Sequence, residues 1–180
     1  LRRPPQPPGL PGELRPESGG IGLGIVPGIG IGPALGIGGS TGTGGATAWS
    51  VDLTPPADRA GDASGGGIAY DAGTVYATTG FGELVALDAS SGSVRWRQKF
   101  GSAVGGAPAV DGGTVYVVAR DGSAWAAASG NGRLRWQVAG TPAQAGVVGV
   151  SAPAVSGDQV IFPFTSGQML SVLRESGTPV

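Results

Sequence analysis

The chain has 180 residues, of which 40% are hydrophobic and 13% charged, and its formal net charge is −1. This hydrophobic content is enough for a packed core, whereas the near-neutral charge provides no electrostatic footprint for nucleic acid. The sequence contains neither Cys nor His. Thiolate and imidazole metal ligands, disulfides and nucleophiles that need a His base are therefore excluded.

The first 46 residues differ in composition from the rest of the chain. They hold more than half of the 15 Pro and a dense run of Gly. The apolar stretch at 21–37 is interrupted by Pro27, Pro33 and frequent Gly, so it does not predict a membrane-spanning helix. No strand periodicity is visible there. We predict that residues 1–46 are disordered or lie outside the fold, and that residues 47–180 form the ordered domain.

The ordered part begins with a strand at 48–53, in which Trp49 is the prominent side chain. The next unit offers four short runs of β-branched, aromatic and aliphatic residues, bounded by Gly and Asp, which predict strands near 67–70, 74–79, 83–87 and 94–100. Asp-Ala-Gly, Gly-Phe-Gly and Asp-Ala-Ser-Ser-Gly segments separate these runs. We expect turns at these three places.

The four-strand unit is repeated along the chain. The segment 71–76 recurs at 111–116, and Trp96 recurs as Trp136, both with an offset of 40 positions. A more divergent third copy follows with an offset of 45, because the Ala-Pro-Ala-Val segment at 107–110 returns at 152–155. In that register the next Trp would stand at position 181, so we expect the chain to be an internal piece of a longer array.

Each repeat ends in the pattern Ala-x-Asp-x-x-x-Gly-x-x-x-Trp or a variant of it. Asp88 can accept backbone N–H groups across a turn, and Gly92 and Gly132 can take the positive φ that closes it. Trp96 and Trp136 offer large flat surfaces for packing against a neighbouring unit. We therefore interpret Asp88, Gly92, Trp96, Gly132 and Trp136 as structural residues.

Four short antiparallel strands in each repeat of about 40 residues are typical of the blades of a β-propeller. The sequence thus predicts an all-β fold, a partial propeller of about two and a half four-stranded blades out of a ring of eight. Such a piece would leave two apolar ends exposed, and we expect it not to be a stable globule by itself.

The repeat resembles the tryptophan-docking repeat of pyrroloquinoline quinone dehydrogenases and of their non-enzymatic relatives. The enzymatic members are known to hold calcium through acidic and amide side chains, to use an Asp base and often to carry a Cys pair. This chain has no Cys, and its acidic residues mostly stand in turns beside Gly. We expect no catalytic, cofactor-binding or metal-binding residues, no cofactor and no small-molecule substrate. A fragment of such a dehydrogenase remains the alternative.

The third copy also resembles the BamB-like lipoproteins of the outer-membrane β-barrel assembly machinery. The resemblance rests on Val-Val-Gly-Val-Ser-Ala-Pro-Ala-Val at 147–155 and on Gly-Gln-Met-Leu-Ser-Val-Leu at 167–173. It implies a non-enzymatic scaffold at the periplasmic face of the outer membrane that binds the POTRA domains of the barrel-inserting subunit. In that family the loop before Ser-Ala-Pro faces the partner, which implies partner contacts at Ala145, Val147 and Val148. The alternative is that this loop only connects two blades.

Overall fold

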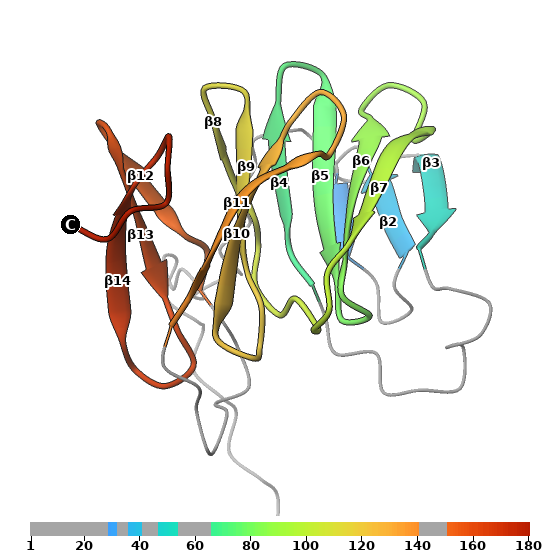
Figure 1. Cartoon of the computed structure of the whole chain (residues 1–180). Coiled ribbons are helices and arrows are strands. Elements are labelled where there is room, and N and C mark those ends of the chain that lie inside the picture. Colours follow the sequence, from blue (N-terminus) through green and yellow to red (C-terminus); the bar gives the residue numbers. More distant parts are fainter. Residues whose placement is uncertain (1–28, 32–35, 41–46, 54–65, 141–150) are drawn as a thin grey trace, which may run out of the picture.

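The computed structural model describes residues 29–31, 36–40, 47–53, 66–140 and 151–180. In these residues all regular structure is β, and the strands form four antiparallel sheets in chain order. Figure 1 shows the sheets standing side by side from the blue N-terminal strands to the red C-terminal ones. The predicted all-β fold built from four-stranded antiparallel blades is confirmed.

The two central sheets are complete blades. The first contains β4 (Ile68–Asp71), β5 (Thr74–Thr79), β6 (Glu83–Asp88) and β7 (Val94–Lys99), paired in that order. The second contains β8 (Ala109–Asp111), β9 (Thr114–Val118), β10 (Ser123–Ala128) and β11 (Leu134–Ala139), again paired in chain order. The strands predicted for the first blade agree with the observed ones to within one residue at every end.

The last sheet has three strands, namely β12 (Ala154–Ser156), β13 (Gln159–Pro163) and β14 (Met169–Leu173). A fourth strand starts beside β14, because Pro179 forms a bridge with Val172 and the Val180 N–H donates to the Ser171 carbonyl at 3.0 Å. The third repeat therefore follows the same order of strands as the two complete blades.

The first sheet consists of β1 (Ile29–Ile31), β2 (Gly36–Ser40) and β3 (Thr47–Asp52). Its first two strands lie inside the segment predicted to be outside the fold, so strand pairing extends upstream of the predicted boundary at residue 47. Backbone groups alone make such a ladder. The segment alternates Ile with Gly and not with polar side chains, which is why it was not predicted to form strands. The other positions of the segment 1–46 lie outside the described residues, and their exclusion from the fold stays a prediction.

Side chains on the central strands point alternately into the two spaces on either side of their sheet. On β5, Val75 and Ala77 pack toward β3, whereas Tyr76 packs toward the β8–β11 sheet. On β9, Val115 packs toward the preceding sheet and Tyr116 toward the following one. Because successive side chains of a strand point to opposite faces, one buried strand supplies two cores. Each core thus lies between sheets, as expected for a propeller.

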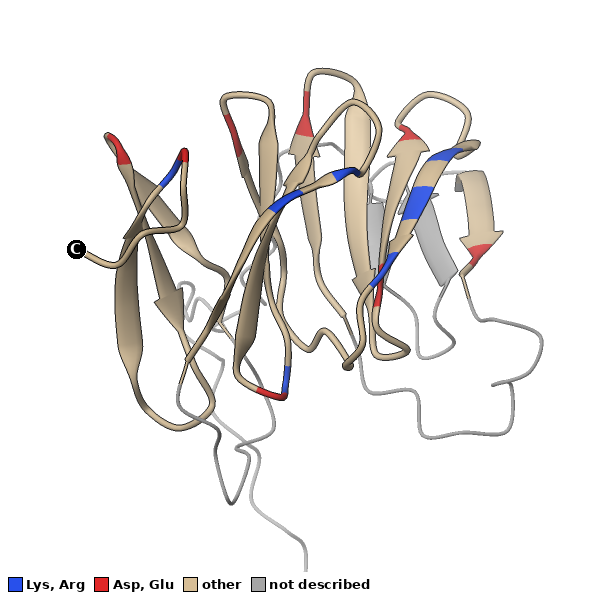
Figure 2. Ribbon diagram, viewed as in Figure 1, with Lys and Arg blue, Asp and Glu red and all other residues tan. Residues whose placement is uncertain are grey.

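The first strands of successive sheets are also neighbours, since β4 contacts β8 and β8 contacts β12. The fourth strands β7 and β11 are by contrast largely exposed. Figure 2 shows that basic residues line these fourth strands, whereas acidic residues stand mainly at strand ends. The sheets therefore fan out from a line of inner strands to charged outer ones.

Gly132 provides a test of how closely the blades must approach. Its φ is +73°, and a Cβ atom there would lie 2.6 Å from Cε3 of Trp96. We expect Gly132→Ala to lower the free energy of unfolding by at least about 1–2 kcal/mol, the cost of left-handed backbone for an L-residue. Urea denaturation measures the change.

Gly130→Ala is the matched control, because a Cβ atom at Gly130 meets nothing within 4 Å and Gly130 does not have a positive φ. It lies in the same turn and adds the same methyl group. Equal losses of stability in the two variants would contradict the proposed close approach of Trp96.

Candidate functional site

The predicted structural residues meet at the junctions between sheets. Trp96 leaves β7 and its indole N–H donates to the Ser129 carbonyl of the next sheet at 2.9 Å. Trp136 leaves β11 and donates in the same way to the Arg174 carbonyl at 2.9 Å. Both rings lie against a glycine with positive φ, Gly132 in the first case and Gly177 in the second.

An equivalent contact precedes these two. Trp49 on β3 donates to the Ala89 carbonyl at 3.0 Å, and a Cβ atom on Gly92 would lie 2.6 Å from the Trp49 ring. Gly92 has a φ of +73°. The same contact therefore stabilises three consecutive junctions between sheets. In each, a tryptophan donates a hydrogen bond to the last hairpin turn of the next sheet and packs on that turn.

Asp88 organises the first of these turns. Its carboxylate accepts the Ser90 N–H at 2.9 Å, the Ser91 N–H at 3.1 Å and Arg95 Nη2 at 2.7 Å. Hydrogen bonding from the Ser90 side chain, then from Arg95 and the backbone, holds the pKa of Asp88 well below its ordinary value. The ionised form is thus favoured by the folded turn.

The predicted partner residues Ala145, Val147 and Val148 lie outside the described residues, as does the whole loop 141–150. Their role in partner binding stays a prediction.

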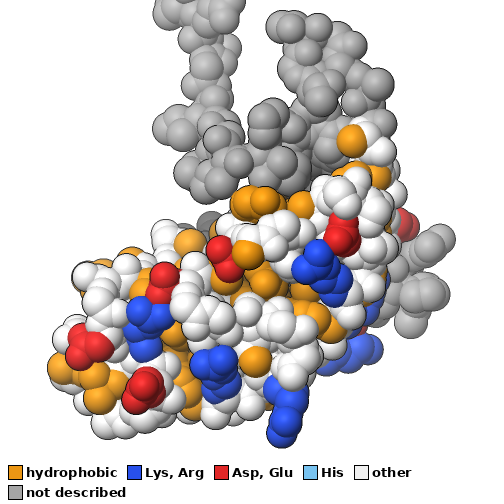
Figure 3. All heavy atoms as spheres, turned by 90° about the horizontal axis from the view of Figure 1, so that it is seen from above, with side chains coloured by type: hydrophobic (Ala, Val, Ile, Leu, Met, Phe, Trp, Pro, Cys, Tyr) orange, Lys and Arg blue, Asp and Glu red, His pale blue; other side chains and the backbone are white. Residues whose placement is uncertain are grey.

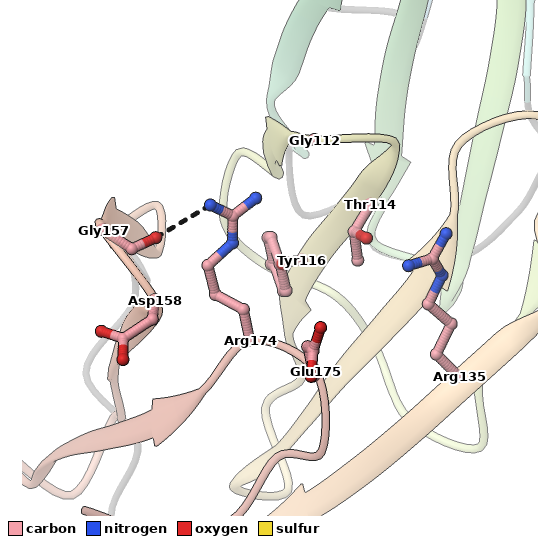
Figure 4. A pocket seen from close by; sticks show the side chains of 8 residues that line it. All are labelled: Gly112, Thr114, Tyr116, Arg135, Gly157, Asp158, Arg174 and Glu175. Atoms are coloured by element: carbon pink, nitrogen blue, oxygen red, sulfur yellow. Dashed lines mark hydrogen bonds between the residues drawn. The ribbon is translucent and has the colours of Figure 1, made fainter.

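A pocket with a volume of about 440 Å³ lies between the third and fourth sheets, and we had not predicted it from the sequence. Figure 4 shows Arg135 on one side and Arg174, Glu175, Gly157 and Asp158 on the other. Eight residues line it: Gly112, Thr114, Tyr116, Arg135, Gly157, Asp158, Arg174 and Glu175. The pocket is therefore bounded by both signs of charge.

Arg174 ties the two walls of this pocket together. Its Nη1 donates to the Gly157 carbonyl at 2.9 Å, and its Nη2 forms an ion pair with Asp111 on β8. The neighbouring Tyr116 hydroxyl and, after it, the Asp111 carboxylate raise the pKa of Arg174. Tyr116 is itself buried, with its ring 5.9 Å from that of Trp136. One sequence signal was available, since Arg174 and Glu175 replace Ser129 and Gly130 of the previous copy.

The described residues contain no group of three His, Cys, Asp or Glu side chains arranged to hold a metal ion. Nor is there, in the described ranges, a helix long and apolar enough to cross a bilayer. Figure 3 shows the face of the molecule that points upward in Figure 1, and acidic and basic side chains are interspersed on it.

The chain matches a protein-family model over most of its length. The model of the family described as outer membrane protein assembly factor BamB matches residues 39–180. The chain belongs to this family. A search of curated proteins found no match.

Solved structures share the fold. BamB from Moraxella catarrhalis is similar with a TM-score of 0.71 and 23% identity, over 84% of this chain and 44% of that protein. The quinohemoprotein alcohol dehydrogenase ADHIIG from Pseudomonas putida HK5 gives a TM-score of 0.67 and 19% identity, over 86% of this chain and 32% of the enzyme.

The quinohemoprotein alcohol dehydrogenase from Comamonas testosteroni gives a TM-score of 0.62 and 16% identity, over 81% of this chain and 31% of the enzyme. The chain thus spans less than half the length of each of these three structures. At these identities the likeness establishes the quinoprotein-like propeller fold, which BamB and the dehydrogenases share.

The lowered pKa of Asp88 predicts that the stability of the fold depends on pH. A carboxyl group whose pKa is lower in the folded state stabilises the fold above its unfolded-state pKa, and this contribution is lost as the pH falls. We expect the protein to lose stability below about pH 4, near the ordinary value of 3.8, and Asp88→Asn to flatten this part of the curve. Thermal melts from pH 7 to pH 2.5 measure the effect.

Ser90→Ala serves as the graded control, because it removes the hydrogen bond that contributes most to the shift and leaves the carboxylate in place. Its curve should lie between those of the wild type and Asp88→Asn. Parallel curves for all three proteins would show that Asp88 does not carry this pH dependence.

Proposed function

We propose that this chain forms part of a non-enzymatic propeller scaffold of the outer-membrane β-barrel assembly machinery. The observation that carries the proposal is the match of residues 39–180 to the BamB family, and the similarity to Moraxella catarrhalis BamB supports it. The scaffold would act at the periplasmic face of the outer membrane and bind the POTRA domains of the barrel-inserting subunit.

The contacts of the described residues support a scaffold role. Three of the acidic side chains that stand near turns have structural partners: Asp88 binds Arg95, Asp111 binds Arg174, and Asp121 accepts the Ser123 N–H and hydroxyl. Glu83, which is buried, pairs with Arg97 at 3.0 Å. These carboxylates stabilise turns, strand ends and blade junctions.

We place the partner contact at the loop 141–150, with Ala145, Val147 and Val148 as the contacting residues. Side chains of this kind bind by burying apolar surface. A carboxylate at the same positions would be desolvated without a partner, which is costly in an interface.

The test is a binding assay between the full-length protein and the purified POTRA domains of the barrel-inserting subunit. We expect the double variant Val147→Asp/Val148→Asp to weaken binding about ten-fold or more, the effect of losing a hot-spot contact. Val94→Asp is the matched control, because Val94 is an exposed valine on the outer strand β7. Its affinity should equal that of the wild type.

Two outcomes would contradict this proposal. If the wild-type protein retains no POTRA-containing partner, the assembly role itself is contradicted. Equal affinities of the wild type and the loop double variant, with a measurable complex, would leave that role in place and move the contact away from the loop.

A fragment of a pyrroloquinoline-quinone-dependent dehydrogenase is the second candidate, favoured by the similarity to the two quinohemoprotein alcohol dehydrogenases. Titration of the full-length protein with pyrroloquinoline quinone and calcium separates the two candidates. Stoichiometric binding of the quinone, followed by its absorbance, would support the dehydrogenase and contradict the non-enzymatic scaffold.

A further inference from the structure

The last hairpin turns of the three repeats have the same backbone. In each, the N–H of the first residue donates to the carbonyl of the sixth at 2.8 Å, and the N–H of the fifth donates to the carbonyl of the first at 2.8 Å. The glycine at the fifth position has a φ between 71° and 73° in all three. These turns cover 88–93, 128–133 and 173–178, and they differ only in their side chains.

The first turn shows how this backbone holds a carboxylate. The group belongs to Asp88 and lies against the N–H groups of Ser90 and Ser91, at 2.9 and 3.1 Å. Arg95 on the following strand adds a charged donor, its Nη2, at 2.7 Å. Two backbone amides and one guanidinium therefore form a receptor that is filled from within the same chain.

The second turn keeps the backbone of this receptor and an arginine at the same sequence position, and it lacks the carboxylate. Ala128 stands where the first turn has Asp88, whereas Arg135 stands where it has Arg95. The N–H groups of Gly130 and Asn131 correspond to those of Ser90 and Ser91. The third turn provides the contrast, because Leu173 stands at the position of Asp88 and Val180 at that of Arg95, so neither position carries an acid or an arginine.

Arg135 is positioned to bind an anion. It is exposed, and one of its nitrogens, Nη2, donates to the Gly113 carbonyl at 3.2 Å. A guanidinium has five N–H donors, so most of them are left for another group. Among the described residues no carboxylate forms an ion pair with Arg135, in contrast to Arg95, Arg97 and Arg174.

We propose that the turn 128–133 together with Arg135 is a binding site for a carboxylate from another molecule. The carboxylate would take the place that Asp88 occupies in the previous repeat, between the amides of Gly130 and Asn131 and the Arg135 guanidinium. This site is independent of the proposed assembly role, because it depends only on the geometry of the turn.

The neighbouring pocket favours an acidic side chain of a polypeptide as the source of this carboxylate. Arg135 lines one side of the pocket of about 440 Å³, and the carboxylates of Asp158 and Glu175 lie across it. A peptide can place an acidic group on Arg135 and a basic or amide group opposite Asp158 and Glu175. A small free acid would make only the first of these contacts.

The test is a titration of the ¹⁵N-labelled full-length protein, followed by the backbone amide signals of Gly130 and Asn131. The probes are acetyl-Gly-Glu-Lys-amide, the matched acetyl-Gly-Gln-Lys-amide and sodium acetate, at constant ionic strength with chloride as counterion. We expect the glutamate peptide to shift both amide signals and the glutamine peptide to leave them unchanged.

The acetate arm distinguishes the two sources. A dissociation constant for the glutamate peptide well below that for acetate identifies a polypeptide ligand, and equal constants identify a site for carboxylates in general. Both results support the carboxylate site. Arg135→Gln should raise the dissociation constant about ten-fold, since it removes the charge-assisted hydrogen bonds.

Two further variants make the test specific. Ala128→Asp should fill the site from within, abolish the response of Gly130 and Asn131 to the peptide and raise the melting temperature. Asp88→Ala should create a second responsive site at the amides of Ser90 and Ser91, which do not respond in the wild type.

The proposal is overturned if Gly130 and Asn131 do not respond to the glutamate peptide, or respond equally to the glutamine peptide. It is also overturned if Ala128→Asp folds and still responds like the wild type.

Discussion

The architecture depends on the contact of one tryptophan with one glycine at each junction between sheets. Trp49, Trp96 and Trp136 each donate their indole N–H to a carbonyl of the next sheet, and each ring lies where a side chain on the facing glycine would stand. The hydrogen bond fixes the direction of the ring, and the missing Cβ lets the turn approach it. Sheets that cannot bury both faces alone are thereby held in a series.

This arrangement separates the roles of the strands. The middle strands of the two complete blades are buried on both faces and build the cores. Their fourth strands carry the tryptophan inward and charged residues outward. The turns docked by tryptophan have a fixed backbone, so their remaining side chains are free to vary between repeats. Asp88, Ala128 and Leu173 stand at the same place in three such turns, and only the first of them supplies its own carboxylate. A repeated scaffold can therefore acquire different surface chemistry at each junction without any change in the fold.

Most of the fold could be predicted from the sequence, because period-two alternation, Gly at turns and the spacing of Trp are local signals. The strands β1 and β2 could not, since Ile alternates there with Gly and not with polar side chains, and the ladder pairs through the backbone. The pocket beside Arg135 was also missed, because its walls come from two repeats and their distance depends on how the sheets dock. For the loop with Ala145, Val147 and Val148, the prediction rests on family resemblance alone.

The central claim is that Trp96 and Gly132 act as a single interaction. A double-mutant cycle with Trp96→Leu and Gly132→Ala, measured by urea denaturation, tests this directly. If the ring and the glycine are coupled, Gly132→Ala will cost at least about 1 kcal/mol less in the Trp96→Leu background than in the wild type, because the added methyl group no longer meets the indole ring. Additive losses would show that the glycine is required only for its backbone conformation, and they would contradict the account of how the blades are held together.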